Sequence, residues 1–267
     1  MLRGASAEAL RELTGSLSSS GTLEDQAQLG RDLFGVVGVL RSDAALRRAL
    51  TDNSVEGDSK AGLAGAVFGK AVGAPAAALV ADAASRRWTS SGDLTAAIEQ
   101  LAVVTTVRSA GAKGKQVGDE LFGVRRMIDV NPELRSALAD PSRSTADRTG
   151  LLAGLLSGKV QGATETLVAQ VVNRAQGSVD SALDEYLELA AQALEETVVT
   201  VHTARELSAD DQQRLADALS KQYATTVQLH VVIDPGLIGG LKVEIGDDVI
   251  DGTVSSRLDD ARRAVAG

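Results

Sequence analysis

The sequence contains no cysteine, and aromatic residues make up only 2% of its 267 positions. Without cysteine the chain has no disulfide, no thiolate nucleophile and no cysteine-based metal site. Hydrophobic residues still account for 44% of the chain, so its cores must be built from small aliphatic side chains. Such cores suit helices packed on helices better than sandwiches of sheets. The composition therefore predicts a mainly α-helical protein.

Long apolar runs are also absent from the sequence. The most membrane-like stretch, residues 61–81, is interrupted by Lys70 and Pro75, and no apolar run reaches the ~20 residues that a bilayer requires. Arg3 near the N-terminus is not followed by an apolar segment, so we expect no secretory signal. We expect no direct membrane insertion, and any association with a membrane should go through partner proteins.

Positive charge is scarce relative to negative charge. Asp and Glu number 36 against 27 for Lys and Arg, which gives a formal net charge of −9. Such a chain repels phosphate backbones and anionic lipid headgroups, so we expect no nucleic acid partner. Its length suggests roughly two domains.

Part of the sequence recurs after 88 positions. Residues 33–36 read Leu-Phe-Gly-Val, and the same four residues stand at 121–124. Around both copies the apolar residues follow helical spacing, and an 88-residue period is too long for a solenoid of short repeats. The repeat predicts two helical bundles in tandem, residues 1–92 and 93–196. Helix starts are indicated by Thr22 with Asp25, Ser42-Asp43, Pro75 and Asn131-Pro132.

The residue pattern changes near Thr197. Residues 197–203 are rich in β-branched side chains, residues 226–233 alternate between apolar and polar, and residues 241–251 indicate a hairpin. Helices are expected from Ser208 and from Ser255 or Ser256. The fold class predicted is mainly α, with two tandem helical bundles followed by a small α+β domain over residues 197–267.

Three short motifs in this last region resemble a known family. Residues 234–240 (DPGLIGG), residues 246–253 (GDDVIDGT) and Arg257-Leu258 resemble the C-terminal signature of the ATP synthase delta/OSCP family. Residues 131–135 (NPELR) are similar to the helical domain of that family. Ordinary members carry one helical domain, whereas the duplicated form resembles the delta subunits of actinobacteria. Thr253 stands where the family often has serine.

The resemblance implies a subunit of the peripheral stalk that has no active site and no cofactor. The helical module would receive N-terminal segments of the α subunit, and the C-terminal domain would hold a b-type stalk subunit. The protein would lie at the cytoplasmic face of the plasma membrane and resist rotation, so that proton flow drives ATP synthesis. Two rival interpretations stay open: a free-standing helical adaptor, and an enzyme whose site the sequence does not reveal.

The family also implies where a helix of the α subunit would dock, namely beside the first and fifth helices of one bundle. Apolar residues at these places in the first copy are Leu10, Leu13, Leu17, Leu79 and Val80. Core packing is the alternative role for most of them. The second copy offers Ile98, Leu101, Leu167 and Val168, but Thr105 replaces Leu17. We therefore expect the docking site in the first copy.

Other candidate sites carry weaker signals. The glycines of residues 236–240 suit turns and close packing better than a phosphate cradle, since neither phosphate-loop pattern is present. His202 and His230 are too few for a histidine-based metal cluster. The acidic residues Asp247, Asp248 and Asp251 are explained by turn chemistry, because their spacing is not that of an EF-hand loop. We expect no metal site.

Catalytic arrangements are likewise missing from the sequence. There is no Gly-x-Ser-x-Gly elbow, and cysteine is absent. Trp88 could anchor a partner, because tryptophan is enriched in binding hot spots, but the completion of the first bundle's core is the preferred interpretation. No residue is therefore assigned a catalytic role.

Overall fold

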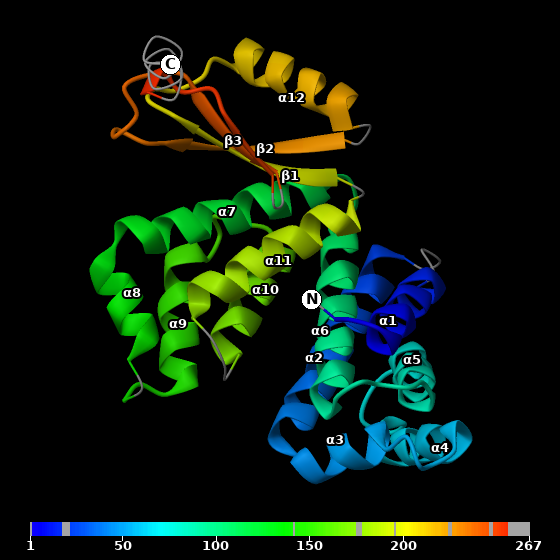
Figure 1. Cartoon of the computed structure of the whole chain (residues 1–267). Coiled ribbons are helices and arrows are strands. Elements are labelled where there is room, and N and C mark those ends of the chain that lie inside the picture. Colours follow the sequence, from blue (N-terminus) through cyan, green and yellow to red (C-terminus); the bar gives the residue numbers. More distant parts are fainter. Residues whose placement is uncertain are drawn as a thin grey trace, which may run out of the picture. The chain divides into compact units, whose positions relative to one another are not determined.

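The structure is a computed structural model that describes residues 2–17, 22–140, 142–174, 178–194, 196–223, 226–245 and 248–255. The chain divides into two compact units, Met1–Ala190 (unit 1) and Ala191–Gly267 (unit 2). Unit 1 is helical, and unit 2 combines one long helix with a small sheet (Figure 1). The predicted fold class is therefore confirmed.

The 88-residue repeat reappears in the helix boundaries of unit 1. The helices are α1 (Ala5–Ser16), α2 (Leu23–Ser42), α3 (Ala44–Thr51), α4 (Gly57–Phe68), α5 (Ala74–Ser85), α6 (Ser91–Arg108), the short 3-10 helix η1 (Gly111–Lys113), α7 (Gly114–Val130), α8 (Pro132–Ala139), α9 (Thr145–Leu156), α10 (Gly162–Asn173) and α11 (Val179–Ala193), which runs past the end of unit 1. Both ends of α3, α4 and α5 recur 88 residues later in α8, α9 and α10.

The predicted helix starts follow the expected capping chemistry. Thr22 and Asp25 form a capping box at the start of α2, because each side chain accepts a hydrogen bond from the other residue's backbone N–H. The Asp43 carboxylate caps α3, and Pro75 stands in the first turn of α5. Asn131 is the residue before α8, although its amide donates to Met127 O instead of capping the helix.

Helix α6 is the element that joins the two copies. As the sixth helix of the first copy, α6 corresponds to α11 in the second copy. As the first helix of the second copy, it corresponds to α1 in the first copy. It contacts α1, α2, α3 and α5 of the first copy and α7 and α10 of the second, and it lies between them in Figure 1. Its buried residues are Leu94, Thr95, Ala97, Ile98, Glu99, Leu101, Ala102, Val103, Val104, Thr105, Thr106 and Val107. The two copies thus share one central helix, which begins next to the boundary predicted at residues 92/93.

Trp88 belongs to the core of the first copy. Its side chain is buried, and its indole N–H donates a 2.8 Å hydrogen bond to Ala83 O at the end of α5. The amide of Asn53 donates to the Trp88 carbonyl oxygen from another part of the bundle. The interpretation of Trp88 as a core residue is confirmed.

In the described part of unit 2, helix α12 covers a four-stranded sheet. Its elements are β1 (Glu196–Thr203), α12 (Ala209–Tyr223), β2 (Thr226–Ile233), β3 (Leu241–Ile245) and β4 (Asp248–Asp251). The strand order is β2-β1-β3-β4, in which β1 and β2 are parallel and the other pairs are antiparallel. Helix α12 makes the crossover between the parallel strands, and Ser208 hydrogen-bonds Asp211 at its start.

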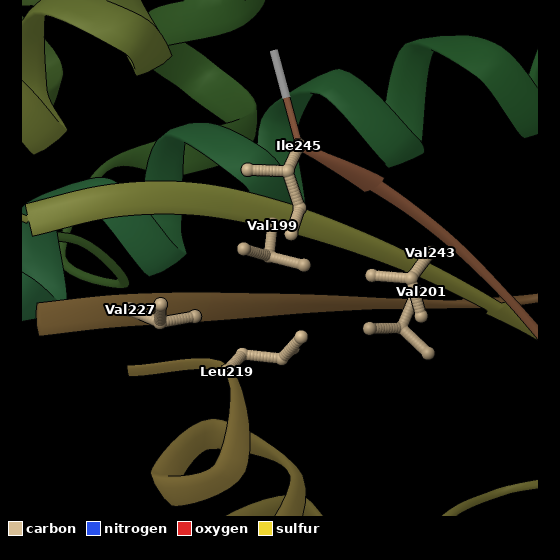
Figure 2. Close-up of a cluster of buried hydrophobic side chains, with 6 residues drawn as sticks. All are labelled: Val199, Val201, Leu219, Val227, Val243 and Ile245. Carbon is tan, nitrogen blue, oxygen red and sulfur yellow. The ribbon is translucent and has the colours of Figure 1, made fainter. Parts of the chain in front are cut away.

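The core of unit 2 lies between the sheet and α12. Figure 2 shows Leu219 of α12 facing Val199 and Val201 of β1, Val227 of β2, and Val243 and Ile245 of β3. Since Val199 and Val201 are both completely buried, β1 forms the centre of this core. Part of the alternation seen in the sequence corresponds to the covered face, since Val227 is buried in this core and Leu229 packs against it, whereas Ile233 at the end of β2 is exposed.

The glycine-rich segment 234–240 makes a tight loop between β2 and β3. Gly240 has a φ of +85°, and a Cβ there would lie 2.8 Å from Thr253 Cα. The Asp234 carboxylate accepts the Gly236 N–H at 2.8 Å, which closes a turn. These contacts support the structural interpretation of the glycines. The predicted hairpin turn at Gly246-Asp247 and the expected C-terminal helix with Leu258, Ala261 and Val265 lie outside the described residues.

Candidate partner-binding surface

Helices α1 and α5 lie next to each other in the first copy. The carboxylate of Glu12 on α1 pairs with Arg86 directly after α5, and Arg86 also pairs with Asp82 at 3.1 Å. The Ser6 hydroxyl donates to Asp93 at 2.6 Å and accepts the Thr89 N–H at 2.8 Å. Helix α1 is therefore fixed against α5 and against the start of α6.

The five residues proposed for partner binding separate into two groups. Leu13 is completely buried and Val80 is 1% exposed, so both belong to the core of the bundle. Leu10, Leu17 and Leu79 are half-buried and reach the surface from the two neighbouring helices. We call these three side chains the α1–α5 surface. Helical spacing alone did not separate the inward-facing positions of these two helices from the accessible ones.

The corresponding positions of the second copy are closed. Ile98, Leu101 and Thr105 of α6 are at most 4% exposed, and Leu167 and Val168 of α10 are buried as well. Helix α2 of the first copy packs on α6, where Gly30 approaches Thr106 closely. The first and second copies are therefore not equivalent, and only the first retains accessible leucines at these positions.

Exposed apolar side chains also occur elsewhere among the described residues, and sequence reasoning missed those on α4, on α9 and around Ile238. On α4, Leu63 and Val67 are 37% and 40% exposed, and Leu155 of α9, 88 residues after Val67, is also exposed. In unit 2, Ile238 is 82% exposed beside Val254, whose backbone N–H donates to Gly239 O. Their signal in the sequence is an apolar residue at a turn or on an otherwise polar helix face, and that signal is weak.

The remaining candidates for chemistry form no site among the described residues. His202 lies 3.6 Å from Glu244, whereas His230 is buried in β2. A hydrogen bond from Lys242 lowers the pKa of Glu244, and the same contact raises the pKa of Lys242. The Asp251 carboxylate accepts the Thr253 N–H, as turn chemistry predicts, and Asp247 lies outside the described residues.

In the described part of the chain, no cluster of three or more His, Cys, Asp or Glu side chains could hold a metal ion. None of the described helices combines the length and the apolar character required to span a bilayer.

Comparison with known proteins identifies the family. Residues 101–265 match the family model of the ATP synthase delta (OSCP) subunit. The protein "ATP synthase subunit delta" of Nocardioides sp. is 47% identical over 268 residues, covering 100% of this chain and 98% of the relative. Its Streptomyces coelicolor counterpart is 40% identical over 271 residues, covering 99% and 98%. The chain belongs to the ATP synthase delta (OSCP) family.

The extent of these matches reflects the duplication. The delta (OSCP) model begins within α6, so it spans the second copy and unit 2, whereas the actinobacterial relatives align with both copies. A chain of the Toxoplasma gondii mitochondrial ATP synthase hexamer aligns with 62% of this chain and 96% of its own length, at 19% identity and a TM-score of 0.35. Delta (OSCP) subunits are non-catalytic, and the resemblance seen in the sequence is confirmed.

Proposed function

We propose that this protein is the stator subunit that links the catalytic head of an F-type ATP synthase to its membrane sector. The observation that carries the proposal is the full-length similarity to actinobacterial ATP synthase delta subunits. In this role the protein resists rotation of the head, so that proton flow through the membrane sector drives ATP synthesis. It works at the cytoplasmic face of the plasma membrane and is attached there through its partners.

For the head, the proposed contact is the α1–α5 surface, which would receive an N-terminal helix of the α subunit. Leu10 on α1, Leu17 directly after α1 and Leu79 on α5 offer accessible aliphatic anchors, and the Glu12–Arg86 ion pair links α1 to the end of α5. The matching positions in the second copy are buried, which supports the choice of the first copy. Each anchor that a partner covers could contribute ~1–3 kcal/mol to binding.

For the stalk, the proposed contact is unit 2, which would hold a b-type subunit. Unit 2 is compact and has its own core between α12 and the sheet, as expected of an attachment domain. Its exposed Ile238 and Val254 offer apolar contact area at one place on its surface. In this proposal the head binds to unit 1 and the stalk binds to unit 2.

The contact with the head can be tested by titration of a synthetic α N-terminal peptide into the full chain. Leu10→Gln and Leu79→Gln should each weaken binding, by about tenfold for the loss of one buried anchor. Leu63→Gln is the matched control, because Leu63 is a similarly accessible leucine on α4. Equal loss in the control, or no loss in the two test variants, would contradict the proposed site.

The contact with the stalk can be tested in membranes that carry a chain shortened by residues 197–267. The shortened chain should still bind the head, but ATP synthesis driven by a proton gradient should fall because the head can then turn with the rotor. Normal synthesis by these membranes would refute the assignment of stalk binding to unit 2.

A further inference from the structure

A hollow of about 290 Å³ lies where the two helical copies meet in unit 1. We propose that this hollow, the junction pocket, binds an oxyanion, either a free ion of the phosphate type or a carboxylate. Its walls come from the end of α2, from α3, from the first half of α6 and from the residue that follows α10. The lining residues are Arg41, Arg47, Gly92, Thr95, Ala96, Glu99 and Arg174.

The charges around the junction pocket favour an anion. Glu99 accepts a 2.6 Å hydrogen bond from Arg41, and Arg174 lies 2.5 Å from Glu185, so two of the three arginines have carboxylate partners. Arg47 donates instead to the carbonyl oxygens of Leu40 and Arg41. Among the described residues no carboxylate lies within 4.0 Å of its guanidinium. The junction pocket therefore has one more cation than anions, although the chain as a whole carries a net charge of −9.

A buried hydroxyl in the same wall lacks a partner. Thr95 is 7% exposed, and its Oγ1 has no hydrogen-bond partner in the described part of the chain. Leaving a buried polar group without a hydrogen bond destabilises the folded state, so such groups are uncommon in folded proteins. An oxyanion held by Arg47 could accept the hydroxyl proton of Thr95, because a charged acceptor makes a stronger hydrogen bond than a neutral one.

The repeat shows that the junction pocket is not a general feature of these bundles. Arg135 stands 88 residues after Arg47, yet it pairs with Asp129 at 2.7 Å. Asp129 in turn occupies the position equivalent to Arg41, so the second copy supplies internally the carboxylate that the first copy lacks. The position equivalent to Thr95 is Leu183, which is completely buried. Of the two copies, as far as the structure describes them, the first alone thus combines the unpaired charge with the free hydroxyl.

The proposal can be tested by calorimetric titration of the full chain at constant ionic strength with two probes, inorganic phosphate and acetate. Thr95→Val keeps the shape of the side chain and removes the hydroxyl, and Arg47→Gln removes the unpaired charge. Either change should weaken binding by about tenfold or more, since hydrogen bonds to charged groups are stronger than those between neutral groups. Arg135→Gln is the matched control and should leave binding unchanged.

The two probes distinguish the sources of the oxyanion. Binding of phosphate alone identifies a free phosphate-type ion as the ligand, whereas binding of acetate as well identifies a carboxylate, such as an acidic side chain of a partner. Circular dichroism should confirm that each variant is folded. If Arg47→Gln does not fold, the effect of Thr95→Val on binding tests the proposal by itself. Saturable binding of neither probe at millimolar concentration would overturn the proposal and leave a water-filled pocket. The proposal would also be overturned if Thr95→Val bound the probes as tightly as the wild type, or if Arg135→Gln weakened binding as much as Arg47→Gln does.

Discussion

The hydroxyl of Tyr186 on α11 donates a 2.7 Å hydrogen bond to the carboxylate of Glu99 on α6, and both side chains are almost completely buried. Arg41 of α2 donates to the same carboxylate from the first copy. One buried acid therefore connects a helix of each copy to the shared helix. Burial and the negative charge of Glu99 raise the pKa of Tyr186, so the phenol stays protonated and remains a donor.

We expect Glu99→Gln to lower the free energy of unfolding by about 2–4 kcal/mol, because it leaves the partly buried Arg41 without its carboxylate. Tyr186→Phe should cost about 1–2 kcal/mol, since only one hydrogen bond is lost. Urea denaturation followed by circular dichroism measures both. Glu8→Gln is the control, because the Glu8–Arg11 pair is largely exposed and should contribute little. Similar effects in all three variants would exclude a special role for the buried acid.

A pair of glycines in α2 gives a second prediction. Gly30 faces α6, and a Cβ there would collide with the hydroxyl of Thr106, whereas a Cβ at Gly35 would meet open space. Gly30→Ala should therefore destabilise unit 1 by about 1–3 kcal/mol, as overpacking does. Gly35→Ala should stabilise it by about 0.5–1 kcal/mol, because alanine is the better helix former. Thermal or urea denaturation of the two variants should give shifts of opposite sign; shifts of the same sign would mean that α2 is not packed closely on α6.

Much of this architecture could be predicted from the sequence because repeats and capping residues are local signals. The 88-residue offset, the capping residues Thr22 and Asp43, and the strands of unit 2 all reappear in the structure. The shared role of α6 could not be derived in that way, since periodicity reveals an apolar face but not the element that covers it. The sequence of residues 91–108 did indicate that this helix is buried. Its own small and apolar residues occur on nearly all of its faces, which is typical of a fully buried helix.

The same limit explains why the five residues proposed for partner binding divide into buried and accessible ones. Leu10 and Leu13 differ by less than one helical turn, yet only Leu10 reaches the surface. No sequence pattern singles out Glu99, because an isolated glutamate in a helix is normally solvent-exposed. Its partners Arg41 and Tyr186 lie 58 and 87 residues away, and no local pattern connects them.

The charged cluster between α7, α8 and α11 gives a prediction about acid stability. Hydrogen bonding to Arg125, together with the charges of Arg125 and Arg135, lowers the pKa of Asp129 below its ordinary value of 3.8. The folded state therefore binds the Asp129 proton more weakly than the unfolded state does. Its stabilising contribution is complete above the unfolded pKa and is lost as the pH falls through the folded pKa.

We expect the wild type to be more stable than Asp129→Asn at neutral pH, and the difference should shrink as the pH is lowered through 3.8 and below. The effect should be modest, because Asp129 is 44% exposed and solvent screens the ion pairs. Urea denaturation of both proteins over a series of pH values measures this difference. A gap between the two curves that is the same at acidic and neutral pH would exclude Asp129 as the titrating group.

The loop before β3 gives the last prediction, which concerns unit 2 alone. Gly240 has a φ of +85°, a conformation that costs an L-residue about 1–2 kcal/mol, and a Cβ there would press on the backbone of Gly252 and Thr253. Gly240→Ala should therefore destabilise unit 2 by about 2–4 kcal/mol in total, because the backbone on the other side cannot rotate away as a side chain would. Gly239→Ala is the control from the same loop, where the nearest atom is the side-chain Val254 Cγ2 at 3.3 Å.

Hydrogen exchange measured by mass spectrometry resolves this effect by region. In Gly240→Ala the amides of β1 and β3 should exchange faster, since their protection depends on the stability of unit 2, whereas those of α2 and α6 in unit 1 should keep their rates. Gly239→Ala should change the exchange of β1 and β3 much less, because the Val254 side chain can shift by the few tenths of an ångström required. Faster exchange throughout the chain would show that the units do not unfold independently. Equal effects of the two substitutions would show instead that the positive φ of Gly240 and its close approach to Thr253 are not what stabilises the loop.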